Sequence, residues 1–388
     1  MPHAPMKVLL GELRWREREM VRLLGQFVEC ESPSGNKASV DRMGRLVAAE
    51  WRRRGGAVRI LRQARAGNHV RAEVFLGRNH STALTRQILV LGHLDTVYPL
   101  GTLRKMPFRV AQGRAWGPGT FDMKAGLVLA LFAADALKAA KVHPAKRLVF
   151  LWTSDEETGS ATSRRMIESE ARRSDAVLVL EPSFGPKGRL KTERKGTGTA
   201  EIVVQGRAAH AGIDPAAGVN AVHELALQIV RLMKMNDPRS GVTVQATVAA
   251  GGTVSNVIPD RARAQIDIRF SRLAGGRKIE RVLRGLQPVL KGARIKVRGG
   301  INRPLLERTA AARELFRHAR SLAREMGLSL GEASTGGASD GNFTSAMGVP
   351  TLDGLGAVGD GAHSAHEHVI VSSLPERAAL IAGLLAAL

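Results

Sequence analysis

The first half of the chain alternates continuous apolar runs with longer segments of helical spacing. A short apolar run of about four to eight residues is typical of a strand buried on both faces of a sheet, whereas apolar positions three or four residues apart over a longer stretch indicate a helix. This alternation predicts an α/β layer with a largely parallel central sheet. We expect buried strands at Ile88–Leu91, Leu148–Trp152 and Ala176–Leu180, and helices over residues 38–54, 124–140 and 164–173.

The pattern changes near residue 194. Strands and helices now follow one another in the order β-α-β-β-α-β, which is the ferredoxin-like α+β arrangement. From about residue 303 the α/β pattern resumes. We therefore expect residues 1–193 and 303–388 to form one domain, interrupted by an inserted domain at 194–302. The insert is expected to contain strands at 199–205, 242–250, 262–270 and 293–297 and helices at 217–235 and 277–290, and the final part to contain helices at 310–326 and 375–388 and a strand at 351–353.

The charge balance of the chain is strongly basic. Its 388 residues are 44% hydrophobic, which indicates a globular protein of about two domains. Lys and Arg number 58 against 35 Asp and Glu, a net charge of +23 that suggests a nucleic-acid partner. However, the basic residues are spread along the chain, and the 4% aromatic content offers few platforms for base stacking. We interpret the excess as a general basic surface and expect no nucleic-acid partner.

The sequence also bears on compartment and on metal chemistry. No stretch approaches the ~20 uninterrupted apolar residues of a membrane-spanning helix, so we expect no membrane partner. Residues 14–19 contain five charged side chains where a secretory signal would have its apolar core. We therefore expect a cytoplasmic protein. Cys30 is the only cysteine, which excludes an intrachain disulfide and a thiolate zinc cluster, so any metal site must use His, Asp and Glu.

Acidic and His residues gather where the expected buried strands end. Taken one at a time, these residues have simpler explanations: Asp122 could cap a helix, since Asp is a preferred N-cap, and Glu156 and Glu157 could be solvated. Together they place several carboxylates and an imidazole at one edge of the sheet, where ligands of α/β proteins bind. Carboxylates crowded without a cation repel one another, and a pair of divalent ions removes that cost. His and carboxylate ligands suit Zn²⁺ or a similar ion.

Five motifs in one order carry a more specific signal. They are His93-Leu-Asp95, Gly117-Pro-Gly-Thr-Phe-Asp122-Met-Lys, Ser154-Asp-Glu156-Glu157-Thr-Gly, Glu181-Pro-Ser and Ala362-His363-Ser. The motifs resemble the zinc-site motifs of the peptidase family that contains glutamate carboxypeptidase, acetylornithine deacetylase, succinyl-diaminopimelate desuccinylase and aminoacylase. The resemblance runs from about residue 15 to the end of the chain. It implies a zinc-peptidase-like catalytic domain interrupted by a lid and dimerisation domain.

The resemblance also implies a role for each motif residue. His93 and Glu181 would bind one zinc ion, Glu157 and His363 the other, and Asp122 would bridge the two, with Co²⁺ or Mn²⁺ as substitutes. The peptide bond after Asp122 would be cis. Asp95 would hydrogen-bond the ring of His93 and orient it. Glu156 would be the general base that takes a proton from a metal-bridged water. His363 fits the motif better than His366 or His368.

The inserted domain carries further matches. The segments around His210, Asn256 and Arg269 resemble lid motifs of the same family. His210 would donate to the tetrahedral oxyanion, usually from the partner subunit of a homodimer. Asn256 and Arg269 would hold the carboxylate of the substrate, a group that Arg can bind with two parallel hydrogen bonds. Gly336 and Gly337 belong to a Thr-Gly-Gly loop that lines the substrate pocket in the family. Closure of the lid over the substrate is expected.

The resemblance favours a metal-dependent exopeptidase that releases a C-terminal amino acid, closest to glutamate carboxypeptidase. A deacylase of N-acyl amino acids is the alternative within the same enzyme class. A non-catalytic binding protein on this fold is a third possibility, against which the extra carboxylate of Glu156 beside Glu157 argues. The expected partner is a small peptide or N-acyl amino acid. Tyr98, the only tyrosine, is interpreted as a packing residue at the rim of the site.

Overall fold

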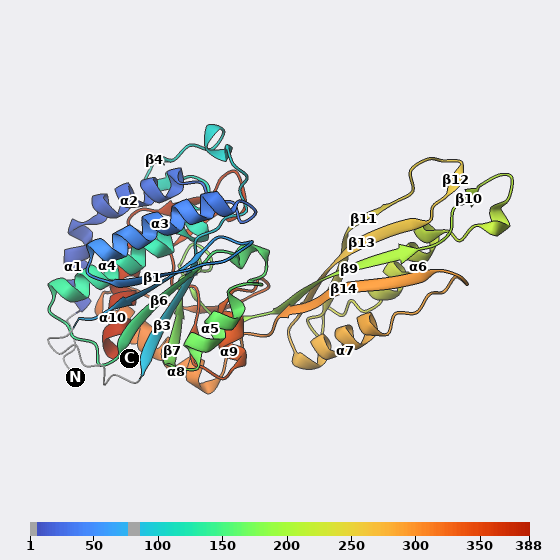
Figure 1. The fold of residues 1–388 in the computed structure, drawn as a ribbon. Helices are drawn as coiled ribbons and strands as arrows, with labels where there is room; N and C mark the ends of the chain where they lie inside the picture. The colour runs from blue at the N-terminus through green and yellow to red at the C-terminus, as the bar shows by residue number, and fades with distance from the viewer. Residues whose placement is uncertain (1–5, 77–85) are drawn as a thin grey trace. The chain divides into compact units, whose positions relative to one another are not determined.

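The computed structural model describes residues 6–76 and 86–388 and divides the chain into two units (Figure 1). The first unit contains the described residues up to Glu193 together with Leu306–Ser334 and Ser339–Leu388. The second contains Arg194–Leu305 and the short segment Thr335–Ala338. The division after Glu193 and Leu305 lies close to the boundaries expected from the sequence, whereas the segment at 335–338 had no sequence signal.

A six-stranded sheet forms the centre of the first unit, with strand order β1-β2-β6-β3-β7-β16. The strands from β6 to β16 are parallel to their neighbours, and β2 is antiparallel to both β1 and β6. The expected mostly parallel sheet is confirmed. The strands are β1 Ala57–Leu61, β2 His69–Val74, β3 Gln87–His93, β6 Arg147–Thr153, β7 Ser174–Val179 and β16 Thr351–Leu352.

Helices cover both faces of this sheet, which is why its central strands read as continuous apolar runs. All seven residues of β3 are buried. Its side chains alternate between two cores, because Ile88 and Val90 pack in one cluster while Leu89 and Leu91 pack in the other. The larger cluster draws on α1 Met6–Trp15, α2 Glu17–Glu29, α3 Lys37–Arg53, α4 Ala125–Ala139, α8 Ala310–Glu325 and α10 Ser373–Ala387, and the smaller on α5 Arg164–Ala171 and α9 Gly341–Ala346.

Small sheets and helical turns complete the first unit. A four-stranded antiparallel sheet has the order β17-β18-β5-β4 and joins the chain before α4 to the segment before α10. Strands β8 and β15 form a separate pair. The bounds are β4 Arg109–Ala111, β5 Arg114–Trp116, β8 Leu190–Arg194, β15 Glu332–Thr335, β17 Gly359–Asp360 and β18 His368–Ile370, with short helical turns at Thr102–Arg104, Thr120–Lys124 and Glu156–Thr158.

The second unit has the expected ferredoxin-like architecture. Its four strands pair in the antiparallel order β11-β13-β9-β14, and helices α6 and α7 pack on one face. Alternate residues of the strands, such as Ile266 and Ile268, are buried beneath these helices. The elements are β9 Gly196–Gln205, β10 Ala209–His210, a turn at Pro215–Ala217, α6 Ala221–Met233, β11 Thr243–Gly251, β12 Val257–Ile258, β13 Arg261–Phe270, α7 Leu273–Arg284 and β14 Arg294–Arg303.

One expected helix in this unit is misplaced. The sequence pattern predicts a helix over 277–290, but α7 spans Leu273–Arg284. The backbone N–H groups of Val289 and Leu290 donate to the buried carboxylate of Glu224 on α6, at 3.0 and 2.7 Å. Gly285 caps α7, and Pro288 has no N–H group with which to continue a helix, so α7 ends at Arg284 and Glu224 holds the irregular segment that follows.

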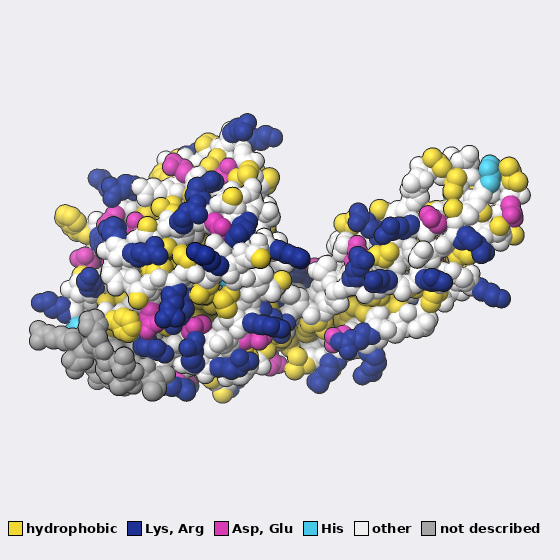
Figure 2. All heavy atoms as spheres, in the orientation of Figure 1, with side chains coloured by type: hydrophobic (Ala, Val, Ile, Leu, Met, Phe, Trp, Pro, Cys, Tyr) yellow, Lys and Arg dark blue, Asp and Glu magenta, His cyan; other side chains and the backbone are white. Residues whose placement is uncertain are grey.

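Two further observations concern the molecule's surface and helices. Lys and Arg side chains are scattered over the visible face of both units in Figure 2, as a general basic surface requires. Within residues 6–76 and 86–388, none of the helices has both the length and the apolar character needed to cross a membrane.

Candidate metal centre

Acidic and imidazole side chains lie at the carboxyl ends of the parallel strands β3, β6 and β7, at one edge of the central sheet. His93 is the last residue of β3, and it pairs with Thr153 at the end of β6. Glu156 and Glu157 follow β6, and Glu181 comes just after β7. Because β3 lies between the other two strands, the three loops converge on His93.

Asp122 lies between two imidazoles. Its Oδ1 atom is 3.2 Å from Nε2 of His93, and its Oδ2 atom is 3.3 Å from Nε2 of His363. The same His93 nitrogen is 3.5 Å from Oε1 of Glu181, and the same His363 nitrogen is 3.3 Å from Oε2 of Glu157. The five side chains thus form two groups that share Asp122. The peptide bond between Asp122 and Met123 is cis, as the family resemblance implies.

The donor set of this cluster fits divalent cations. Atoms of His93, Asp122 and Glu157 lie within 4.8 Å of one another, a spacing at which one ion can bind all three. The Oε1 atom of Glu157 is buried and has no hydrogen-bond partner in the described part of the chain. Such an atom is costly unless a ligand satisfies it. Imidazole and carboxylate donors without sulfur are those of catalytic zinc and related sites.

The charges in the cluster perturb one another strongly. Hydrogen bonds with Asp122 and Glu157 raise the pKa of His363 to about 11. Burial raises the pKa of Glu157, because the charged carboxylate is poorly solvated there. These shifts show how strongly the carboxylates attract positive charge. Protons supply that charge in the metal-free cluster, and a divalent ion would displace them.

Asp95 fixes both His93 and the loop that carries the two glutamates. Its backbone carbonyl oxygen lies 2.9 Å from Nδ1 of His93, whereas its carboxylate Oδ1 lies 3.5 Å from that nitrogen. Both the backbone and the carboxylate of Asp95 therefore contact the His93 ring, and the backbone contact is the shorter. The carboxylate also accepts the backbone N–H groups of Glu156 and Glu157, at 3.3 and 3.2 Å, and the hydroxyl of Ser34 at 2.7 Å.

Glu367 is a site residue that the sequence did not single out. Its buried carboxylate accepts the backbone N–H groups of Phe121 and Asp122, both at 2.8 Å, and that of Gly119 at 3.0 Å. The hydroxyl of Tyr98 donates to it at 2.5 Å and also lies 3.0 Å from the backbone oxygen of Ser364. Tyr98 is thus more than a packing residue at the rim, because it and Glu367 tie the loop of Asp122 to the loop of His363.

The neighbouring imidazoles have other surroundings. Nδ1 of His368 lies 2.9 Å from the backbone oxygen of His366, and the His368 ring packs on Trp116 with centroids 4.4 Å apart. His366 is exposed and contacts the hydroxyl of Ser364. Only His363 of the three contacts the carboxylates of the cluster among the described residues.

Comparison with known proteins agrees with this geometry. Residues 89–387 match the model of Peptidase family M20/M25/M40. The chain belongs to this family. It is 31% identical over 370 residues to carboxypeptidase G2 of Pseudomonas sp. (strain RS-16), covering 94% of this chain and 88% of that protein. It is 29% identical over 317 residues to a succinyl-diaminopimelate desuccinylase of Magnetococcus marinus, covering 74% and 80% of the two chains.

The solved structures show the same fold. The aminopeptidase PepT of Bacillus cereus superposes with a TM-score of 0.73 at 20% identity, covering 95% of this chain and 98% of that one. Membership of the family makes the protein a hydrolase of the carboxypeptidase and amidohydrolase type, in a family that depends on metal. The cluster around Asp122 is the part of the described chain that offers such a metal site.

The second unit holds the remaining candidate residues. His210 in β10 pairs with Val257 in β12, and the backbone of Ala211 donates to the carbonyl of Asn256 at 2.9 Å, so His210 and Asn256 lie in one two-stranded corner. The Nδ1 atom of His210 accepts the N–H groups of Gly212 and Ile213, both at 3.1 Å. Because Nδ1 accepts these hydrogen bonds, the neutral ring carries its proton on Nε2, and Nε2 is the nitrogen that can donate to a ligand.

Arg269 and the Thr-Gly-Gly loop lie together in the same unit. The guanidinium of Arg269 donates to both carboxylate oxygens of Asp267, each at 2.9 Å, and Nη1 is 3.5 Å from the backbone oxygen of Gly336. The neighbouring Gly337 oxygen accepts from Arg194 at 3.2 Å. Asp267 therefore occupies the edge of the Arg269 guanidinium formed by Nε and Nη2, and Nη1 is the donor closest to the loop.

Proposed function

We propose that the protein is a zinc-dependent exopeptidase that cleaves an amide bond beside a free carboxylate and releases a C-terminal amino acid of the glutamate type. The observation that carries the proposal is Asp122, whose two oxygens each face one imidazole at 3.2 and 3.3 Å. This is the arrangement expected of a carboxylate that bridges two ions. The 31% identity to carboxypeptidase G2 over nearly the whole chain supports the choice of substrate class.

We assign the residues of the first unit three roles, which are metal binding, general-base catalysis and positioning of the base. When bound, the zinc ions would polarise the scissile carbonyl and lower the pKa of water towards 7. His93, Asp122, Glu157, Glu181 and His363 would hold them. Glu156 adjoins a ligand without belonging to the cluster itself, and we assign it the general-base role, taking a proton from water and delivering it to the leaving amine. Asp95 would fix its position through the backbone contact at 3.3 Å.

The second unit would supply substrate recognition. We assign Asn256, Arg269, Gly336 and Gly337 to the carboxylate end of the substrate, with Nη1 of Arg269 as its donor. His210 would stabilise the oxyanion through Nε2, from the partner subunit of a homodimer. A deacylase acting on N-acyl amino acids is the second candidate, favoured by the 29% identity to a desuccinylase. Both activities would use the same metal ligands and differ in the pocket for the acyl group.

The test is hydrolysis of a defined substrate panel. Zinc-loaded or cobalt-loaded protein is incubated with acyl-glutamate conjugates, dipeptides, and acetyl and succinyl amino acids, and the products are identified by mass spectrometry. We expect release of free glutamate from the conjugates, with a loss of about 10²–10⁴-fold in Glu156→Gln. Glu168→Gln, which removes a carboxylate on α5, is the matched control and should keep full activity. Exclusive release of acetate or succinate would favour the deacylase, and no hydrolysis would refute both.

The dimer has a separate test. Glu156→Gln and His210→Ala are each expected to be inactive alone. If His210 acts across subunits, mixing and re-associating equal amounts should restore roughly a quarter of the wild-type activity, because half of the dimers then contain one complete site. No recovery, with exchange verified by mass, would refute a role for His210 across the interface.

A further inference from the structure

The outer face of the second unit's sheet is unusually basic. Helices α6 and α7 cover one face, so every second residue of the strands points to the other. On β13 the uncovered positions begin with Arg261 and Arg263, both exposed, while their neighbours Ala262 and Ala264 are buried. On β14 the exposed positions are Arg294, Lys296 and Arg298, which alternate with partly buried Ile295 and Val297. These five cations form what we term the basic face.

The register of the strands sets the cations in rows across the central strand β9. Arg261 and Arg294 both pair with Gln205, so a neutral residue lies between two guanidinium groups. In the next row Arg263 and Lys296 both pair with Val203. Neighbouring strands are about 4.8 Å apart, so the backbones of each cation pair are separated by roughly 10 Å. Like charges at this spacing repel, and neither row contains a carboxylate that would offset the repulsion.

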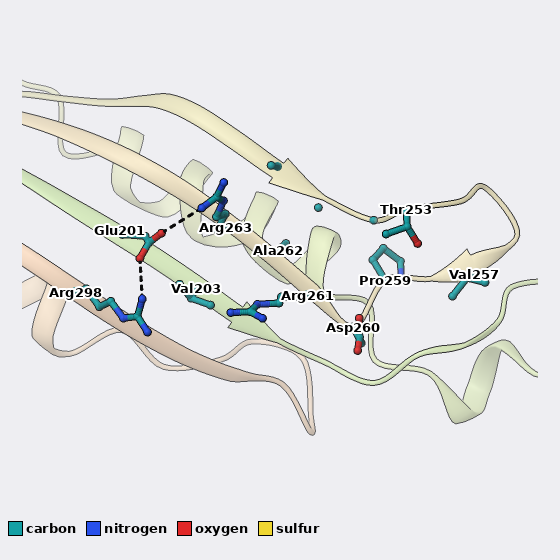
Figure 3. Close-up of a pocket in the computed structure, with 13 residues that line it drawn as sticks. Glu201, Val203, Thr253, Val257, Pro259, Asp260, Arg261, Ala262, Arg263 and Arg298 are labelled. Atoms are coloured by element: carbon teal, nitrogen blue, oxygen red, sulfur yellow. Dashed lines mark hydrogen bonds and ion pairs between the residues drawn. The ribbon is translucent and has the colours of Figure 1, made fainter. Parts of the chain in front are cut away.

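The carboxylates nearby neutralise only part of this charge. Glu201 lies 3.3 Å from Arg298 and 3.9 Å from Arg263, as the dashed lines in Figure 3 show. Asp260 lies at the opposite end of the hollow from Glu201, just before β13. Within the described part of the chain, Arg261, Arg294 and Lys296 have no carboxylate at ion-pair distance. Five cations therefore face two carboxylates, and the unneutralised ones lie in adjacent rows.

The basic face is also hollowed. Two adjoining cavities of about 410 and 610 Å³ share Val203, Asp260, Arg261 and Arg298. In Figure 3 the side chain of Arg261 lies between Val203 and Asp260, and all three residues line the first cavity. These volumes fall within the range of small-ligand sites. None of the described residues that line them is aromatic, so the stacking contacts by which single-stranded nucleic acid binds are missing.

We propose that the basic face is a binding site for a small anion that carries two or more phosphate groups. Linked phosphates place several negative charges within a few ångströms, and this density matches the two rows of cations. The planar fork of Arg donates two parallel hydrogen bonds to a phosphate. The site is built entirely from the second unit and is distinct from the residues assigned above to metal and substrate. It does not depend on the proposed exopeptidase function.

The test measures binding of inorganic tripolyphosphate to the full-length protein by calorimetry at physiological salt. Wild-type protein should bind one equivalent per chain, and Arg261→Gln/Arg294→Gln should bind at least 10-fold more weakly. The matched control is Arg277→Gln/Arg281→Gln, which removes two exposed charges from α7 on the other side of the sheet and should change the affinity less than 2-fold.

Each other outcome contradicts the proposal. An equal loss in both double variants would mean that tripolyphosphate responds to net charge alone. Binding that survives in Arg261→Gln/Arg294→Gln would lie elsewhere, as at the metal cluster. Tighter binding of citrate than of tripolyphosphate would assign the face to polycarboxylates. Tighter binding of a single-stranded oligonucleotide, lost in the same variant, would assign it to nucleic acid.

Discussion

The carboxylate of Glu367 accepts hydrogen bonds from the loop that carries Asp122, so a substitution of Glu367 should lower the affinity of the cluster for metal. Its carboxylate accepts three backbone N–H groups of the loop from Gly119 to Asp122. Glu367→Gln replaces one acceptor oxygen with a donor, which opposes those N–H groups. Residues that orient metal ligands typically change metal affinity by about 10–100-fold. We expect a loss of this size in Glu367→Gln, measured by zinc titration against a competing chelator.

The control for this variant is Glu307→Gln, which removes an exposed carboxylate of the same unit. It should bind zinc as the wild type does. Circular dichroism and the unfolding midpoint of the metal-free proteins show whether the fold is intact. Unchanged zinc affinity in a folded Glu367→Gln protein would mean that the loop holds its position without the carboxylate.

Glu170 should make stability depend on pH in the acid range. It is 7% exposed and accepts from Gln87 at 2.8 Å, Arg71 at 2.9 Å and Arg173 at 2.7 Å. Burial opposes ionisation, but these contacts outweigh it and lower the pKa of Glu170. A carboxyl whose folded pKa lies below its unfolded value stabilises the fold above the unfolded pKa, and that contribution is lost as pH falls through the folded pKa.

We therefore expect Glu170→Gln to be less stable than the wild type by about 2 kcal/mol near neutral pH, the size of hydrogen bonds to a charged group. The difference should shrink as pH falls below about 4.5, the unfolded value. Urea unfolding between pH 3 and 7 measures it. A difference that is constant over this range would mean that the ionised carboxylate does not carry the stabilisation.

The residues of the His/Asp/Glu cluster could be singled out from the sequence because each is local to a recognisable signal. His93 and Glu181 directly follow apolar runs, and strand ends of a parallel sheet meet at one edge. Tyr98 and Glu367 lie 269 residues apart, and neither has a neighbouring pattern that points to the other. A contact of this kind is set by tertiary packing, so it becomes visible only in the structure.

At the scale of elements, Glu224 on α6 holds the segment that connects α7 to β14. It is fully buried, and its oxygens accept the N–H groups of Val289 and Leu290 as well as the amide of Gln228. Helical spacing alone extends the neighbouring helix to residue 290. Gly285 caps α7 and Pro288 follows three residues later, so the helix ends at Arg284 although the apolar spacing continues.

Glu224→Gln should destabilise the second unit. The new amide group points a donor at the backbone donors of residues 289 and 290, so buried N–H groups lose their acceptor. The cost of such a loss is about 1–3 kcal/mol. Glu280→Gln, a change at a partly exposed residue of α7 that pairs with Arg284, is the control and should cost less than about 0.5 kcal/mol. Urea unfolding monitored by hydrogen exchange of β9 and β14 reports on this unit. Equal stability of the two variants would contradict the assigned role.

At the scale of the whole molecule, metal binding and the stability of the fold are thermodynamically linked. Ions that bind the folded cluster and not the unfolded chain stabilise the fold by RT ln(1 + [L]/Kd), about 2.7 kcal/mol at 100-fold excess over Kd. We expect the chelated protein to unfold at lower temperature than the zinc-loaded protein. Glu157→Gln should show a smaller zinc-dependent shift, because it changes the carboxylate whose Oε1 has no hydrogen-bond partner among the described residues. An identical shift in this variant would place the stabilising ion elsewhere.

The net charge of +23 is spread over the chain and is not confined to one site. We expect it to affect the rate at which anionic substrates associate with the protein. Lys and Arg are scattered over the visible surface of both units (Figure 2), so the field extends beyond any one pocket. Such a field accelerates the approach of anions, and salt weakens it because the Debye length is about 10 Å at 0.1 M. If the substrates are acyl amino acids, kcat/KM should fall between about 0.02 and 0.3 M NaCl, with a steeper slope for a doubly charged glutamate conjugate than for the matched alanine conjugate. Arg277→Gln/Arg281→Gln, which changes two exposed residues of α7 that are not among the assigned substrate residues, should reduce both slopes slightly and in proportion to substrate charge. Equal slopes for the two conjugates would mean that salt acts on the catalytic step or on the fold, and that the basic surface does not steer the substrate.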